Sequence, residues 1–362
     1  MKFIRHLIVN LITTAAVIIA LSMLTVAYSD RVHPTTFHYI GCLGMTLPLF
    51  VAMNILSLLV LLTVKWKRAW IPLAGFVLAY VPIRTFLPLN IDREPPEGCI
   101  KLITYNVCGY TGNGKYDNGL DTVTTYITAF DADIVCLQED MSLKGKPLER
   151  WQELYPYNDT VHVSSNEKYV NAIGIHTRYP ILKKERIEYE SKTNGSMAYF
   201  LLVGSDTVIV VNNHMESTHL TVNDRKRYKE VIDGNTDKKT VKEDAHLLIG
   251  KLSDGMALRA AQAEAVHQFV ESHMQYPIIV CGDFNDTPIS YVRHTMAKGM
   301  TDCFMERGCG PGLSYNQKGF HFRIDHIFCS PQLTPYKCIV DSKMDASDHY
   351  PMLCWLKMTD KP

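Results

Sequence analysis

The chain has 362 residues, 47% of them hydrophobic, and its 37 basic and 37 acidic residues balance. This composition leaves room for a large core and for additional apolar segments. The first 98 residues carry 8 of the basic and 4 of the acidic residues, so 29 and 33 remain from Cys99 onward. This slightly acidic part argues against a surface that binds duplex nucleic acid by neutralising phosphates, although it is compatible with a small phosphate-bearing substrate.

Three apolar runs occupy the N-terminal quarter, at residues 7–28, 39–64 and 70–89. The first two are uncharged, and each exceeds the roughly 20 residues that cross a bilayer core. The third contains Arg84, which must snorkel or face a partner helix. We therefore expect residues 1–89 to form a membrane anchor of three transmembrane helices over these ranges. A cleaved signal peptide is an alternative for the first run, but its apolar region is too long and no clear small-x-small site follows.

The charges that flank these runs predict the orientation of the anchor. Basic residues lie before the first run and between the second and third, namely Lys2, Arg5, Lys65, Lys67 and Arg68. Because basic flanks stay in the cytoplasm, the chain after the third run belongs outside it. We expect an integral protein of a bacterial inner or cell membrane with its large domain on the non-cytoplasmic side.

A polar linker at residues 90–98 joins the anchor to a domain at residues 99–362. Nine residues span at most about 30 Å, so the domain is held near the membrane. The ten cysteines show no Cys-x-x-Cys or Cys/His zinc spacing and are best interpreted as small buried hydrophobes. Cys303 and Cys309 are the one close pair considered for a disulfide.

Polar side chains recur at the ends of strand-like runs throughout the domain. The run 278–281 is apolar and ends at Gly282, and Asp283 and Asn285 follow it. Further acids, amides and histidines stand at the ends of other such runs: Asn106, Glu139, His214, Asp325, Asp348 and His349. The strands at 99–108 and 133–137 are joined by an amphipathic helix at 122–130, and such a crossover places both strand ends on one side of a sheet.

The chemistry of these eight groups suits phosphoester cleavage. Oxygen ligands without thiolates favour a hard cation, Mg²⁺ or Mn²⁺, over structural zinc. Histidines and amides can stabilise a phosphoryl transition state while an aspartate positions water. For His214 a simple hydrogen bond in a turn is the alternative. The charge-dense stretch 216–255 is interpreted as a solvated insertion or helical excursion, with contact to the membrane or a lid over the site as the other hypothesis; a helix follows at 256–272.

The motifs around these residues resemble the endonuclease/exonuclease/phosphatase superfamily, which includes pancreatic deoxyribonuclease, abasic-site endonucleases, neutral sphingomyelinases and inositol-polyphosphate phosphatases. The matching segments occur in the family's order: Thr104-Tyr105-Asn106-Val107, Leu137-Gln138-Glu139, Asn213-His214, Gly282-Asp283-Phe284-Asn285, Arg323-Ile324-Asp325-His326 and Ser347-Asp348-His349-Tyr350-Pro351. Together they span about residues 100–356, which is nearly the whole domain.

The resemblance implies an α/β fold, a four-layered sandwich of two packed mixed β-sheets flanked by helices. It also implies that Glu139 holds Mg²⁺ (or Mn²⁺), with Asn106 and Asp348 completing or supporting the metal shell. Abasic-site endonucleases carry an Asp two residues after the first Asn, where this chain has Cys108. A second metal-binding carboxylate and a role in DNA repair are therefore in doubt.

The resemblance further implies catalytic roles for the remaining groups. Asp283 would orient or deprotonate the attacking water, and Asn285 would bind the phosphate. His349, oriented by Asp325, would offset charge on the phosphate. His214 would act on the phosphate or the leaving group.

These expectations combine into a membrane-anchored, metal-dependent phosphohydrolase, a phosphodiesterase or phosphatase, that works outside the cytoplasm by in-line water attack. The candidate substrates are a lipid headgroup, a small phosphoester or nucleic acid, and no protein partner is inferred. An extracellular nuclease and a non-catalytic, membrane-tethered binding module are the alternatives.

Overall fold

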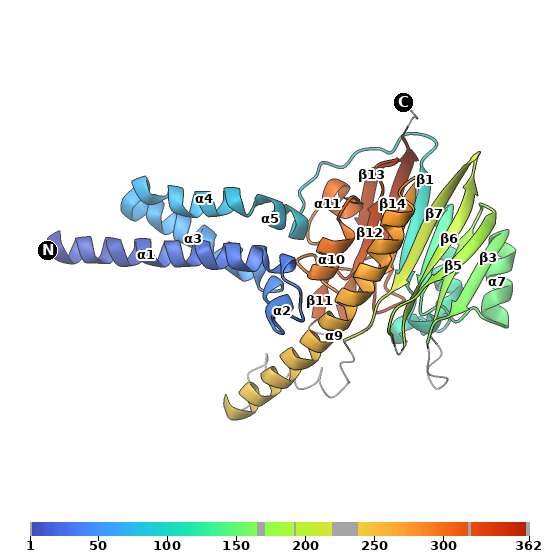
Figure 1. Cartoon of the computed structure of the whole chain (residues 1–362), viewed down its shortest axis with the longest axis horizontal. Coiled ribbons are helices and arrows are strands. Elements are labelled where there is room, and N and C mark those ends of the chain that lie inside the picture. The colour runs from blue at the N-terminus through green and yellow to red at the C-terminus, as the bar shows by residue number, and fades with distance from the viewer. Residues whose placement is uncertain (1, 165–170, 192, 219–237, 318–319, 360–362) are drawn as a thin grey trace.

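The computed structural model describes residues 2–164, 171–191, 193–218, 238–317 and 320–359. Two six-stranded mixed sheets pack face to face between outer helices (Figure 1). The first sheet has the order β13-β14-β1-β2-β4-β3 and the second the order β5-β6-β7-β8-β12-β9. The four-layered sandwich predicted from the motifs is confirmed.

The strands of each sheet are short, as is usual for packed sheets. The first sheet contains β1 (Ile100–Asn106), β2 (Ile134–Gln138), β3 (Tyr157–His162), β4 (Ala172–Thr177), β13 (Leu333–Val340) and β14 (Met352–Met358). The second contains β5 (Ile181–Ile187), β6 (Gly195–Val203), β7 (Asp206–His214), β8 (Ile278–Asp283), β9 (Thr301–Asp302) and β12 (Asp325–Cys329). A small hairpin of β10 (Tyr315–Gln317) and β11 (Phe320–Phe322) lies apart from both.

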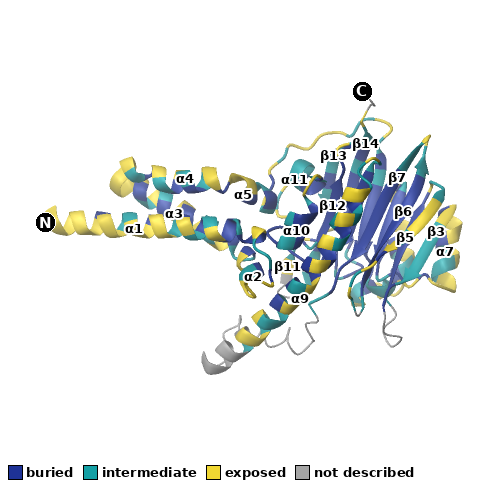
Figure 2. Cartoon of the chain, viewed as in Figure 1, coloured by how far each residue is buried: buried dark blue, intermediate teal, exposed yellow. Residues whose placement is uncertain are grey.

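Three apolar clusters hold the layers together. Side chains from both sheets, such as Leu102 and Val210, interdigitate in the central layer. The outer face of the first sheet is covered by α6 (Gly119–Phe130) and α7 (Lys146–Leu154), through Ile127 and Trp151 among others. The outer face of the second is covered by α9 (Lys238–Ser272) and α10 (Tyr291–Met296). Figure 2 shows the resulting buried interior of both sheets.

Strand direction collects the predicted site residues at one end of the sandwich. β1 pairs with β2 in parallel and β7 pairs with β8 in parallel, so their carboxyl ends coincide within each sheet. His214 is the register partner of Asp283 across β7 and β8. Asp325 is the register partner of Asp283 across the antiparallel pair β8 and β12. The ends of four strands therefore deliver polar groups to one place.

The N-terminal helices extend away from the sandwich as a separate bundle (Figure 1). They are α1 (Lys2–Ala27), α2 (Ile40–Gly44), α3 (Leu47–Lys65), α4 (Trp70–Leu78) and α5 (Tyr80–Phe86). Within the described residues, the segments Lys2–Arg31 and Leu47–Arg68 are long and apolar enough to cross a membrane, each with a mean hydropathy of 2.4. Both leave most of their surface exposed in Figure 2.

Two of the three predicted helices are interrupted in the structure. The range 39–64 is divided between α2 and α3, and the range 70–89 is divided at Ala79 between α4 and α5. Pro82 explains the second break, because it has no N–H to donate to the carbonyl of Leu78 four residues earlier. The hydroxyl of Tyr28 donates to that carbonyl instead. Arg84 pairs with Glu306 of α11 (Cys303–Arg307), at 3.1 Å.

Further contacts fasten the bundle to the sandwich. The side chain of Asn90 donates to the carbonyls of Met305 and Gly308, at 3.0 and 2.8 Å. Arg323 is buried and donates to the carbonyl of Thr85 at the end of the bundle. At the end of α2, a Cβ added to Gly44 would lie 2.0 Å from the carbonyl oxygen of Ile289 in the sandwich, so the two backbones are in contact there. The bundle and the sandwich are thus joined by polar and backbone contacts at several points.

Candidate active site

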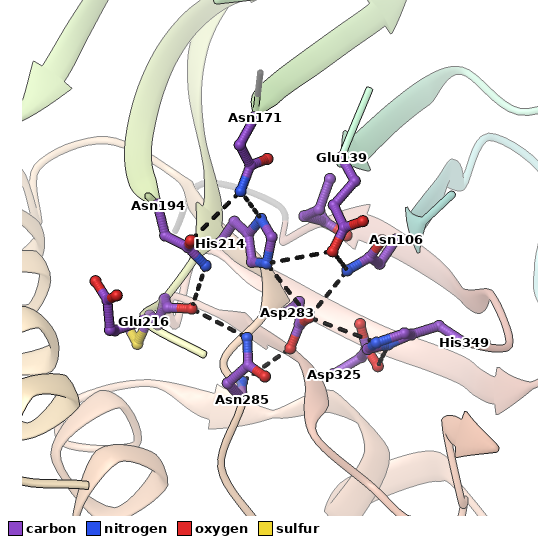
Figure 3. Close-up of polar contacts among 12 residues, drawn as sticks. Asn106, Glu139, Asn171, Asn194, His214, Glu216, Asp283, Asn285, Asp325 and His349 are labelled. Atoms are coloured by element: carbon purple, nitrogen blue, oxygen red, sulfur yellow. Dashed lines mark hydrogen bonds and ion pairs between the residues drawn. The ribbon is translucent and has the colours of Figure 1, made fainter. Parts of the chain in front are cut away.

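A cavity of about 220 Å³ opens where the strand ends meet. It is lined by seven of the eight predicted site residues: Asn106, Glu139, His214, Asp283, Asn285, Asp348 and His349. The eighth, Asp325, lies behind His349 and contacts it (Figure 3). The structure therefore brings the whole predicted set together, although the residues are distributed over 244 positions of the chain from 106 to 349.

His349 bridges two buried carboxylates. Its Nδ1 lies 2.8 Å from Oδ2 of Asp325, and its Nε2 lies 3.6 Å from Oδ2 of Asp283. Burial alone would lower the pKa of His349, but the charges of Asp325 and Asp283 outweigh burial and raise that pKa to about 10. His349 is therefore an imidazolium at neutral pH. Burial raises the pKa of Asp283, while the two neighbouring histidines, His349 and His214, oppose that rise.

His214 has the opposite character, because burial lowers its pKa. Its Nδ1 lies 3.3 Å from Nδ2 of Asn171, which also donates to Oδ1 of Asn194. Since an amide nitrogen donates, Nδ1 accepts and the proton of the neutral ring resides on Nε2. That Nε2 lies 3.7 Å from Oδ2 of Asp283 and faces the cavity from above in Figure 3.

Asn106 connects the two sheets at the floor of the cavity. Its Nδ2 donates to Oε1 of Glu139 at 3.2 Å and to Oδ2 of Asp283 at 3.1 Å. Glu139 keeps 40% of its side chain exposed, yet its position in the cavity raises its pKa through desolvation and, more weakly, through the charge of Asp348. A divalent cation would relieve both effects, so the carboxylates of Glu139 and Asp348 fit a hard metal ion. Asn106 presents its Nδ2 to Glu139, while its Oδ1 accepts from the backbone N–H of Cys108, so it supports the carboxylate rather than offering an oxygen ligand.

A second group of possible ligands adjoins the first, because Nδ2 of Asn106 donates to Oδ2 of Asp283. One ligand atom each of Asp283, Asp325 and His349 lies within 4.8 Å of the others. In this group the charged ring of His349 lies between the two carboxylates and offsets part of their charge. Cys108 occupies the position where a further carboxylate was in question, and burial raises its pKa to about 12. A protonated thiol is a poor metal ligand.

Backbone geometry aims two of these side chains. Glu139, directly after β2, and Asn285, two residues after β8, both adopt positive φ, +53° and +51°. The backbone N–H of Asn285 donates to Oδ1 of Asp283 at 2.8 Å, and its side-chain Nδ2 donates to the carbonyl of Met215 at 3.0 Å. Gly282 has φ +132°, and a Cβ there would lie 2.0 Å from the Asn213 carbonyl. Only glycine permits this approach of β8 to β7.

The sequence did not single out several residues that the structure places at the site. Asn171 and Asn194 stand before β4 and β6 without a motif, so only the folded chain shows that they position His214. The ring of Tyr315 lies 5.1 Å from that of His349. Arg259 of α9 is fully buried and pairs with Asp286 at 3.3 Å beside the cavity.

The charge-dense stretch 216–255 is divided in the structure. Residues 219–237 lie outside the described part of the chain, and residues from 238 onward belong to α9. α9 is thus about twice the length of the predicted helix 256–272. Ser217, Leu248 and Leu252 from this stretch line the cavity. Cys303 and Cys309, considered as a disulfide, are both free thiols, as are the other eight cysteines.

The fold and the cavity together define a class: two-sheet α/β sandwiches with an acid- and histidine-lined pocket at the strand ends. The profile of the endonuclease/exonuclease/phosphatase family matches residues 103–349. This chain belongs to that family. A domain of unknown function, DUF8431, matches residues 9–86. A comparison with curated protein sequences finds no match.

Solved structures share the fold at low sequence identity. The human nocturnin catalytic domain with bound sulfate is 16% identical with a TM-score of 0.51, and the match covers 74% of this chain and 97% of that one. An endonuclease/exonuclease/phosphatase from Bacteroides vulgatus is 16% identical at 0.51, covering 73% and 100%. TDP2 from D. rerio with a single-strand DNA product is 16% identical at 0.50, covering 72% and 100%.

Proposed function

We propose that this protein is a membrane-anchored, divalent-metal-dependent phosphoesterase whose catalytic domain lies outside the cytoplasm. The observation that carries the proposal is the contact set of Asp283, His349 and Asp325 beside the open carboxylate of Glu139. Phosphoester hydrolysis needs a base for the attacking water, positive charge on the phosphate and a metal ion. Asp283, the protonated His349 and the carboxylate of Glu139 as a metal ligand would supply these three in one pocket.

The directions of the pKa shifts suggest different catalytic roles for Asp283, His349 and His214. The raised pKa of Asp283 makes it a stronger base, suited to accept the proton of a water that attacks phosphorus. His349, with a pKa of about 10, keeps its proton and donates from Nε2 to a non-bridging phosphate oxygen. His214 is neutral, so it contributes a hydrogen bond from Nε2 rather than a full positive charge. Asn285 completes the contacts to the phosphate.

Glu139 and Asp348 would hold Mg²⁺ or Mn²⁺, and Asn106 would support the carboxylate of Glu139 through its hydrogen bond. When bound, such an ion supplies charge neutralisation for the phosphoryl group and the leaving oxygen. The carboxylates must be ionised to bind the ion. Binding would offset the desolvation and the repulsion from Asp348 that raise the pKa of Glu139 in the free protein.

The arrangement of the N-terminal helices supports the membrane part of the proposal. The N-terminus of α1 and the turn after α3 lie at the end of the bundle that is far from the sandwich (Figure 1). That end carries the basic residues Lys2, Arg5, Lys65, Lys67 and Arg68. By the positive-inside rule it faces the cytoplasm, which puts the sandwich on the opposite side. The exposed apolar surface of α1 and α3 then contacts lipid.

Hydrolysis by the purified full-length protein in detergent tests the proposal. The substrates are bis-p-nitrophenyl phosphate and p-nitrophenyl phosphate, with Mg²⁺, Mn²⁺ or EDTA, and plasmid DNA tests the nuclease alternative. We expect metal-dependent turnover that falls about 10²-fold or more in Asp283→Asn and in His349→Gln. Asp92→Asn, at an aspartate 71% exposed on the linker, is the matched control and should retain activity.

Metal binding is tested separately by calorimetry. Glu139→Gln should weaken Mg²⁺ binding about tenfold or more. Absence of turnover on every substrate, from a folded protein that binds no metal, would refute the phosphoesterase and favour the binding module.

A further inference from the structure

The cavity has an apolar wall that phosphoester chemistry does not require. Besides the polar groups at the strand ends, its lining includes the apolar side chains of Met45, Leu248, Leu252, Met256, Phe322 and Ile324. A phosphate, its water and a metal ion would all contact the polar floor. The apolar wall is therefore available for another part of the ligand.

This wall is built by the part of the chain nearest the bundle of N-terminal helices. Met45 stands between α2 and α3, and Met256 belongs to α9. α2 and α9 pack closely, because a Cβ added to Gly41 would lie 2.4 Å from Sδ of Met256. Cys42 Sγ also lies 3.6 Å from Ser253 Oγ. The contact positions the cavity directly beside the segment that joins the two membrane-spanning candidates.

Exposed apolar side chains continue from this wall to the surface. On the segment before α3, Phe37, Tyr39 and Leu43 are exposed, and on α9 Leu247 and Ile249 are exposed. The rings of Tyr39 and His246 lie 6.3 Å apart, so the two groups of side chains are neighbours. Figure 1 shows α2 and the N-terminal half of α9 on the side of the sandwich from which the bundle extends. An apolar route thus leads from the bundle to the cavity.

We propose that the substrate is amphiphilic: a phosphoester whose phosphate binds at the strand ends and whose aliphatic chain lies along Met45, Leu248, Leu252 and Met256. This inference rests on the proposed phosphoesterase function and specifies its substrate class. An aliphatic chain in this position is removed from water and contacts apolar side chains, which favours binding. Its outer end would point toward the exposed apolar side chains on α2 and α9. The acidic excess of the domain, 33 acidic against 29 basic residues from Cys99 onward, disfavours a polyanion in the same cavity.

Two substrates that differ only in the length of the alkyl group measure what the aliphatic chain contributes to kcat/KM, because the reacting phosphoester is the same in both. We would compare 4-nitrophenyl octyl phosphate with 4-nitrophenyl methyl phosphate, both below micelle-forming concentrations, on the full-length protein in nanodiscs. Burial of about two additional methylene groups corresponds to a roughly tenfold higher kcat/KM for the octyl ester. In Leu252→Asn the ratio of the two kcat/KM values should fall about fivefold or more.

Leu258→Asn is the matched control. Leu258 lies on the same helix, is 40% exposed and does not line the cavity, so the ratio should stay as in the wild type. Leu248→Asn provides a second test of the wall if Leu252→Asn does not fold. Equal kcat/KM values for the two esters, or an unchanged ratio in folded Leu252→Asn and Leu248→Asn, would overturn the inference and leave the phosphoesterase standing. Preferential cleavage of thymidine 5′-(4-nitrophenyl phosphate) would also overturn it, in favour of a nucleotide. Hydrolysis of p-nitrophenyl phosphate but of none of the three esters would overturn the inference, and hydrolysis of none of the four would refute the proposed function itself.

Discussion

His326 lies beneath the loop that carries Asp283 and Asn285, and its protonation should destabilise the protein in acid. The ring is 2% exposed, and its Nε2 lies 2.9 Å from the carbonyl oxygen of Asp286. Because a carbonyl accepts, the neutral ring donates from Nε2. Burial lowers the pKa of His326 to about 4, although the nearby carboxylate of Asp302 opposes this shift.

The size of the effect follows from linkage. The pKa of an unfolded histidine is about 6.5, so between pH 6.5 and 4 the unfolded state binds a proton that the folded state excludes. Stability from His326 is therefore complete above pH 6.5 and is lost as the pH falls toward 4. The loss amounts to about 2 kcal/mol at pH 5 and about 3 kcal/mol at pH 4.

Thermal unfolding of the full-length protein in detergent, with EDTA, measures this loss for the wild type and for His326→Gln. Glutamine retains a donor for the Asp286 carbonyl but does not titrate. Between pH 7.5 and 5, the Tm of the wild type should fall about 4–8 °C further than that of the variant. His321→Gln, at an exposed histidine, should behave as the wild type. Equal acid sensitivity of the wild type and His326→Gln would refute the reasoning.

Three further changes test other parts of the structure. In the wild type, the guanidinium of Arg293 lies 2.8 Å from the buried carboxylate of Asp302, and Arg293→Met removes this ion-pair partner. The free energy of unfolding, measured in urea, should fall by about 3–5 kcal/mol. A fall below about 1 kcal/mol would contradict the burial of the pair. Asn171→Ala removes the donor to the histidine ring at the end of β7, so kcat should fall about two- to tenfold with little change in KM, and an unchanged kcat would remove Asn171 from the site. Gly44→Ala forces a Cβ against a backbone carbonyl and should cost about 1–3 kcal/mol in thermal unfolding, whereas Gly250→Ala, with open space around its Cβ, should not destabilise.

The strands with buried runs and a polar end were predictable because both signals are local. β1, β2, β7 and β8 each combine apolar residues with an acid, amide or histidine at the end. The sequence does not predict β5. It is an edge strand in which Lys183 and Lys184 are both exposed, so its residues do not alternate between apolar and polar. The family motifs then supplied the topology that pattern alone does not.

The partners of the site residues were not predictable from local pattern. Asn171 meets the ring of His214 only after β4 and β7 come together in the folded chain. Likewise, the N-terminal half of α9 reads as a charged insertion, but in the structure its Leu248 and Leu252 face the cavity. A few apolar residues among many charges produce a weak periodic signal, so the sequence predicts the helix only from Met256 onward.

The several contacts between the bundle and the sandwich have a kinetic consequence. With Arg84 paired to Glu306 and Asn90 bonded to two carbonyls of the sandwich, the domain cannot swing freely on its linker. In the proposed membrane setting the mouth of the cavity then stays at one height above the bilayer. A substrate that resides in the same bilayer is encountered by lateral diffusion in two dimensions, and its effective concentration is set by its density per unit area. Dilution of that substrate with inert lipid should slow turnover, whereas dilution of the vesicles in buffer should not.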